Sequence, residues 1–370
     1  MAEAVLKKPV QNKTDATLKS KTTESPTIFR KTYIEVMRII AAFLVIVNHT
    51  NSYIFLKYSE PESFAWFFSL SYFWISKVAV SVFLMIMGGL LLKKIDSPKK
   101  SIQRVLRMVV VLLVTSAVYY IYLHKSDFSS MSLSDFLHTV VAVRTNNAIW
   151  YLYTYIGLLI LLPILQRMAN SFSKRTTEYL IFISVFVMGI VPLLKVFFNL
   201  RLVPYLTETF FMPLLGIVFV GFYIEKHLNI TKKIFALASF LFVFIIAFEV
   251  LYSHQMYREN PKNYLQLDNR LHLNILLSAI CFYIIFKYIS TVMTTKEMSS
   301  KIVCYFGSLT FGVYLLSDLI MFITKPYYTK LAVQSEHIIF LTILWEIVIF
   351  VACAFITAIL KLIPGIKKFI

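Results

Sequence analysis

The sequence predicts an all-α integral membrane protein with about ten transmembrane helices. Of its 370 residues, 58% are hydrophobic and 15% are charged, whereas a soluble domain averages about 45–50% apolar and about 25% charged residues. The mean hydropathy of +0.73 is correspondingly high. The apolar residues are gathered into separate runs, each close to the roughly 20 residues that cross a bilayer as a helix. These observations exclude an ordinary water-soluble enzyme.

The expected spans follow one another with short loops between them, so we expect residues 33–370 to form a single membrane domain. Residues 1–32 are polar, rich in Lys, Thr and Ser, and precede the first apolar run. We expect a disordered basic cytoplasmic tail there and no cleaved signal peptide. In order, the ten expected spans are 33–56, 72–92, 103–124, 149–165, 178–198, 205–224, 233–252, 271–288, 302–324 and 337–360.

The distribution of cations predicts the orientation of these spans. If the tail is cytoplasmic, 25 of the 37 Lys and Arg residues fall on the cytoplasmic side and 10 on the other, while Arg38 and Lys77 lie within spans. Short cytoplasmic loops carry an excess of Lys and Arg, so both termini are expected in the cytoplasm of a multi-pass plasma-membrane protein. Topology and contact with anionic lipid then account for the net charge of +18, and no nucleic-acid partner is needed.

The first expected span contains three ionisable residues, Glu35, Arg38 and His49. A charge at membrane depth costs at least about 2.5–3.5 kcal/mol, so each needs a partner or a function. Eleven helical residues turn about 20° past three full turns, which places Arg38 and His49 on one face about 16 Å apart. Glu35 can pair with Arg38 one turn away. Spacing alone leaves two interpretations: a charged anchor with an interfacial histidine, or a base for a hydroxyl beside a cation for an anionic substrate.

A second basic site precedes the third expected span. Arg104 and Arg107 share a helix face and follow a segment rich in lysine, residues 93–100. Two guanidinium groups at the beginning of a helix are suited to a phosphate-bearing ligand. An anchor for lipid headgroups is the alternative, and composition alone favours it.

Several motifs together resemble those of the membrane-bound acyltransferase 3 family, the O-acyltransferases that modify bacterial surface polysaccharides. The run from Glu35 through Arg38 to His49 looks like the first-helix motif of that family, and Arg104-x-x-Arg107 looks like its cytoplasmic motif. Residues 80–89, 149–163 and 306–315 are similar to three further family segments, with departures at Met87, Ala148 and Asp318. The resemblance extends over nearly all of the chain after the tail.

The resemblance implies a membrane O-acyltransferase. Acyl-CoA, expected to be acetyl-CoA, would bind from the cytoplasm with its phosphates on Arg104 and Arg107. His49 would be the general base for a hydroxyl of an extracytoplasmic surface glycan or exopolysaccharide, while Glu35 and Arg38 fix the geometry or bind the donor. Whether His49 acts directly as a base or first carries the acyl group is left open. Acyl-CoA is a co-substrate, and we expect neither a bound cofactor nor a metal.

Other polar residues in or near the spans are candidates for contacts with the acceptor or the transition state. Each has a structural alternative: a lysine near the interface can extend to water, an aspartate can pair with a cation, and aromatic residues can form an interfacial belt. These candidates are Lys77, Ser81, Trp150, Tyr151 and Asp318.

Two other functional classes remain as alternatives. A transporter or flippase of a lipid-linked saccharide also suits ten spans with buried charges. A non-catalytic scaffold for polysaccharide-assembly proteins is the third hypothesis, and such proteins are expected partners of an enzyme as well.

Overall fold

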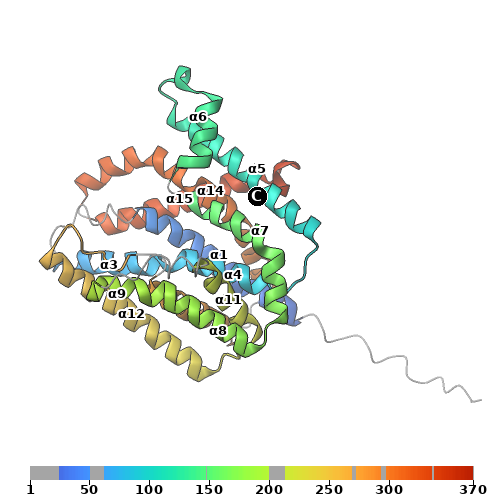
Figure 1. Ribbon diagram of the computed structural model, residues 1–370. Helices are drawn as coiled ribbons and strands as arrows, with labels where there is room; N and C mark the ends of the chain where they lie inside the picture. The colour runs from blue at the N-terminus through green and yellow to red at the C-terminus, as the bar shows by residue number, and fades with distance from the viewer. Residues whose placement is uncertain are drawn as a thin grey trace, which may run out of the picture.

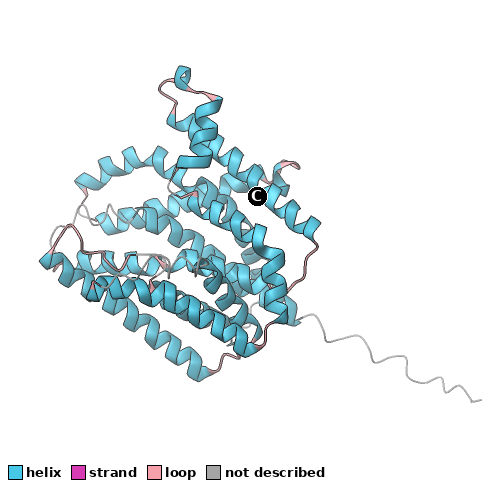
Figure 2. Cartoon of the chain, viewed as in Figure 1, coloured by secondary structure: helices cyan, strands magenta, loops and turns pink. Residues whose placement is uncertain are grey.

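The described part of the chain is a bundle of helices without strands. The computed structural model describes residues 25–50, 62–146, 148–199, 213–268, 272–292, 297–335 and 337–369. Within these ranges every regular element is helical (Figure 2). The helices lie side by side, and one short helical segment projects from the bundle (Figure 1). The predicted all-α class is confirmed.

Eight helical spans among the described residues are long and apolar enough to cross a membrane. Helices α3 and α4 meet at Lys77 and together make one of these spans. The helices concerned are α1 (Ser25–Thr50), α3 (Phe64–Ser76) with α4 (Val78–Leu91), α5 (Pro98–Leu123), α7 (Trp150–Ser171), α12 (Lys232–Glu259), α13 (Leu273–Val292), α14 (Glu297–Gln334) and α15 (Ile338–Leu360).

The other two expected spans correspond to interrupted or shorter helices. The expected span 178–198 lies in α8 (Lys174–Val185), a π-helical turn (Phe186–Ile190) and α9 (Val191–Phe198), which follow one another without a break. Helix α11 (Pro213–Lys226) covers most of the expected span 205–224. Residues 205–212 of that span lie outside the described residues.

Helix α1 begins at Ser25, so it includes the last residues of the segment 1–32 that we expected to be disordered. The reason is visible in the sequence, because Pro26 directly follows Ser25 and proline favours the first turn of a helix. Residues 1–24, and residues 51–56 of the first expected span, lie outside the described part of the chain.

Two glycines allow α4 and α11 to pack backbone to backbone. A Cβ added at Gly88 would lie 1.8 Å from the carbonyl oxygen of Val218, and one added at Gly221 would lie 1.9 Å from that of Met85. Neither position accommodates a side chain. Lipid tails are as apolar as the side chains, so helices in a membrane associate through van der Waals packing, and small residues allow the close approach that this packing needs.

A buried carboxylate fastens the end of α11 to α1, to α13 and to the turn that follows α4. Glu225 is 7% exposed and accepts a hydrogen bond of 2.6 Å from the Tyr33 hydroxyl and one of 3.3 Å from that of Tyr283. The ammonium groups of Lys93 and Lys287 lie 3.5 and 3.7 Å from its two oxygens. The charge is therefore paired, as a buried charge must be.

The segment that projects from the bundle connects α5 to α7. We call residues 128–143 the α6 flap; it consists of a 3-10 turn (Phe128–Ser130), α6 (Leu133–His138) and a π-helical turn (Thr139–Val143) (Figure 1). The Tyr120 hydroxyl of α5 donates 2.7 Å to Asp135 in the flap. The Tyr153 hydroxyl of α7 donates 2.5 Å to the carbonyl of Val140. These bonds attach the flap to both flanking helices.

Candidate active site

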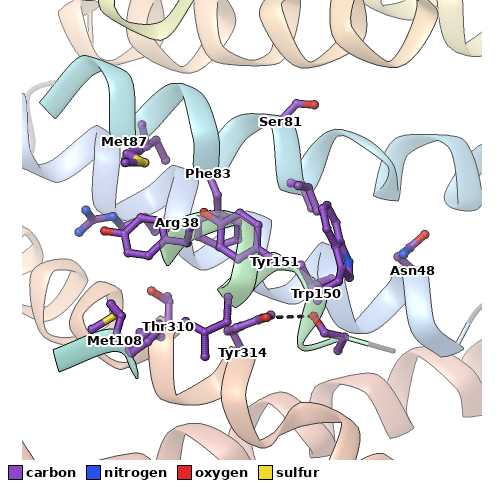
Figure 3. A pocket seen from close by; sticks show the side chains of 18 of the residues that line it. Arg38, Asn48, Ser81, Phe83, Met87, Met108, Trp150, Tyr151, Thr310 and Tyr314 are labelled. Carbon is purple, nitrogen blue, oxygen red and sulfur yellow. Dashed lines mark hydrogen bonds between the residues drawn. The ribbon is translucent and has the colours of Figure 1, made fainter. Parts of the chain in front are cut away.

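A cavity of about 990 Å³ lies among α1, α4, α5, α7 and α14. Both Arg38 and His49 line it, so it extends along the face of α1 that the sequence predicts. Figure 3 shows Arg38 and Asn48 toward opposite ends of the region drawn. The Arg38 end is bordered by Arg38, Arg107, Ser308 and Lys361, and the His49 end by Asn48, His49, Lys77, Arg144 and Asp268.

His49 forms a dyad with a buried carboxylate at its end of the cavity. Its Nδ1 atom lies 3.4 Å from Oδ1 of Asp318, whose residue is 3% exposed. The two residues meet because α1 packs along α14. The backbone of Ala148 also hydrogen-bonds the Asp318 carboxylate. A carboxylate at one ring nitrogen orients an imidazole and leaves the other nitrogen available for a proton.

Arg38 and Glu35 form the ion pair that their spacing predicts, with 2.8 Å between Nη1 and Oε1. The other Glu35 oxygen is buried, and it has no hydrogen-bond partner among the described residues. Gly307 makes room for this side chain, because a Cβ at that position would lie 2.7 Å from the Glu35 Cβ as well as 2.3 Å from the oxygen. The Arg38 side chain remains 31% exposed toward the cavity, where Figure 3 shows it beside Met87.

The structure separates Arg104 from Arg107. Arg107 lines the cavity, whereas Arg104 donates a 2.5 Å hydrogen bond to Asp96 and does not line it. Burial opposes ionisation of Asp96, but hydrogen bonds from Lys100, Gln166 and Arg104 outweigh it and hold the pKa of this carboxyl well below its usual range. Most of the charge of Arg104 is therefore already compensated within the protein.

Lys361 stands beside Arg107 at the Arg38 end. Its ammonium group donates to the Ser308 carbonyl at 2.6 Å and to the Ser308 hydroxyl at 3.2 Å, which fixes it between α14 and the end of α15. Burial and the nearby charge of Arg107 lower its pKa. Two neighbouring cations without a carboxylate partner among the described residues make this end of the cavity suitable for an anion.

Aromatic side chains occupy the middle of the cavity. The Tyr151 ring lies 6.2 Å from Phe83, 6.2 Å from Tyr155 and 5.7 Å from Tyr314, measured between ring centroids. The Tyr314 hydroxyl donates to the Ala148 carbonyl at 2.9 Å, the bond drawn in Figure 3. We call these four residues the aromatic cluster.

The remaining predicted contacts lie nearer the His49 end. Ser81 lines the cavity and is 3% exposed. Lys77 forms a 2.9 Å ion pair with Asp268 and lies 3.9 Å over the Phe73 ring. Trp150 borders the cavity and meets Tyr151 edge to face, between Tyr151 and Asn48 in the view of Figure 3.

Several lining residues were not site candidates in the sequence, among them Lys361, Arg144, Asp268 and Tyr314. Arg144 and Lys361 count only as topology signals in a sequence, and Asp268 carries no such signal, because the approach of all three to the cavity depends on contacts between distant helices. Asn48 also lines the cavity. The sequence feature that could have identified it is its position directly before His49.

A multi-pass helical membrane protein with a histidine–carboxylate dyad and a cationic pocket in one cavity has the parts of a group-transfer enzyme. Searches of curated proteins and of solved structures find no match. The family model described as Acyltransferase domain (Acyl_transf_3) matches residues 31–362. The chain therefore belongs to the membrane acyltransferase 3 family and is a membrane acyltransferase.

Proposed function

We propose that the protein transfers an acyl group, expected to be acetyl, from acyl-CoA to a hydroxyl of an extracytoplasmic cell-surface glycan or exopolysaccharide. The observation that carries the proposal is the single cavity that joins cations at the Arg38 end to the dyad at the His49 end. The cavity would allow the acyl-bearing arm of acyl-CoA to meet the acceptor hydroxyl. The protein would lie in the plasma membrane with both termini in the cytoplasm, as the asymmetry of Lys and Arg between the two sides indicates. The Arg38 end of the cavity would then face the cytoplasm.

The donor phosphates would bind at the Arg38 end. Arg107 and Lys361 border the cavity there without a carboxylate partner among the described residues, whereas Arg104 is engaged by Asp96. We expect Arg104 to act through the position of α5, while Arg107 and Lys361 contact phosphate. Replacing Arg107 or Lys361 by Ala should raise the KM for acyl-CoA at least about 10-fold, because one charge-assisted hydrogen bond contributes that much to affinity.

His49 would act as the general base. The acceptor oxygen attacks the thioester carbonyl while its proton passes to the imidazole, and Asp318, 3.4 Å away, stabilises the imidazolium. The C–S bond then breaks, the new C–O ester bond remains, and the imidazolium returns its proton to the CoA thiolate. Atoms and charges balance without another reactant.

Sealed right-side-out membrane vesicles test this proposal. Labelled acetyl-CoA is trapped inside, surface glycan is supplied outside, and the label on the glycan is measured. His49→Ala and His49→Gln should abolish transfer, whereas the matched control His254→Gln, on α12 outside the cavity, should retain it. Retained glycan acylation in both His49 variants would refute the mechanism.

Deletion of the gene distinguishes an enzyme from a carrier. An O-acyltransferase predicts that deletion leaves an exported glycan that lacks an ester, measured by the mass of surface glycan. A transporter or flippase predicts that lipid-linked saccharide accumulates instead, and that result would reject the proposal.

A further inference from the structure

Arg144 lies at the His49 end of the cavity and has no part in the chemistry above. It ends the π-helical turn of the α6 flap with φ 83° and ψ 140°. Residues with a Cβ rarely adopt positive φ, and a surrounding structure must enforce the strain. Among the described residues the only other non-glycine with positive φ is Asn199, at the end of α9.

The structure around Arg144 holds it in place. Its backbone N–H donates to the Thr139 carbonyl at 2.7 Å. The next residue, Thr145, is 5% exposed and its hydroxyl donates to Ser116 of α5 at 3.4 Å. Asn146 then accepts 2.8 Å from the Ile149 N–H at the beginning of α7. The rim of the cavity is thus fixed to α5 and to the beginning of α7 by the two residues that follow Arg144.

The charge of Arg144 is uncompensated in the part of the chain that the structure describes. Its Nε–H donates only to the neighbouring Val143 carbonyl, at 3.4 Å, and no described carboxylate pairs with the exposed guanidinium. By contrast, Lys77 on the same rim is paired with Asp268. A guanidinium presents parallel N–H donors that match the two oxygens of a carboxylate or a phosphate.

We propose that the acceptor is an anionic glycan, and that Arg144 binds the carboxylate or phosphate of the sugar whose hydroxyl His49 activates. This inference rests on the proposed function and adds the substrate class. Trp150 lines the cavity close to this rim and offers an aromatic face to the sugar ring. The anion then fixes the position of the ring relative to the dyad.

Matched acceptors test the inference in the vesicle assay. The probes are a uronate-containing oligosaccharide, its carboxamide form, and a phosphodiester-linked polyol oligomer. The wild-type protein should prefer an anionic probe to the carboxamide by about 10- to 100-fold in kcat/KM, the range of a charge-assisted bond. The better of the two anionic probes identifies whether carboxylate or phosphate is the natural group.

Three variants separate charge from backbone strain. Arg144→Gln should lose the preference, mainly through KM, and Arg144→Lys should keep part of it. Arg144→Gly relieves the strain but removes the charge, so it should also lose the preference while it folds as well as the wild type. Lys125→Gln, an exposed cation between α5 and the flap, is the control that should keep it.

The outcomes are distinct. Two results would overturn this inference and leave the proposed function standing. One is equal acylation of charged and neutral probes by the wild type, and the other is an Arg144→Gln variant whose activity falls equally toward both kinds of probe. Failure of the wild type to acylate any glycan would reject the proposed function and this inference with it.

Discussion

The substitution Asp318→Asn tests how the dyad works. At 3.4 Å, an imidazolium and a carboxylate attract each other by about 5 kcal/mol with an effective dielectric constant of about 20. If about half of the positive charge has developed on His49 in the transition state, about 2.5 kcal/mol is lost, which is about 70-fold in kcat. Full charge development would raise the loss to several thousand-fold, within the usual range of acid–base catalysis.

The assay is the initial rate of glycan acylation over a range of acceptor concentrations and pH. We expect kcat to fall while the KM values stay within about threefold of wild type, because Asp318 is buried behind the imidazole. Glu249→Gln, which removes a buried carboxylate outside the cavity, is the control.

Two results would refute this reasoning. A kcat within threefold of wild type would mean that the dyad does not assist the reaction. A rise in the KM for the acceptor with unchanged kcat would mean that Asp318 contacts the acceptor, the role that the sequence suggested for it.

Three further predictions concern stability, each measured by thermal unfolding of the purified protein in detergent. Gly88→Ala should destabilise the protein strongly, because its Cβ would lie 1.8 Å from a carbonyl oxygen of α11, while Gly157→Ala, with nothing within 4 Å, should not; equal melting temperatures would contradict the close packing. Glu225→Ala removes a buried carboxylate that pairs with two ammonium groups and accepts hydrogen bonds from two tyrosine hydroxyls, so it should cost about 3–5 kcal/mol, and a loss below about 1 kcal/mol would show that the pairing is not needed. Asp96→Asn should cost about 1–3 kcal/mol at neutral pH through weakened hydrogen bonds. Because the folded-state pKa of Asp96 is depressed, this contribution should be constant from pH 8 to about pH 5 and be lost only below about pH 4; a difference that disappears near pH 6 would contradict it.

The sequence predicts the class of fold and the polar face of α1 because both depend on local periodicity. Arg38 and His49 line one cavity, and Glu35 pairs with Arg38, as helical spacing requires. The pattern also places Arg104 and Arg107 on one face, but it cannot show that Asp96 in the preceding loop compensates one of them.

Contacts between distant segments explain the rest. Asp318 reaches His49 only because α14 packs on α1, and Lys361 reaches Arg107 only through the packing of the last helix. Arg144 acquires its position from a flap whose π-helical turn has no signature in hydrophobic periodicity. A single sequence does not specify such pairings, since each depends on how whole helices are arranged.

The aromatic cluster also matters for the electrical insulation of the membrane. A cavity with charged groups at both ends shortens the apolar barrier that ions and protons must cross, in a cell that stores energy as an ion gradient. The rings of Phe83, Tyr151, Tyr155 and Tyr314 line the intervening region, where apolar surface would oppose the passage of ions. In the proposed reaction the same side chains would border the path of the acyl group and would also have to prevent leakage between turnovers, which would limit how far this part of the cavity can be widened for larger donors.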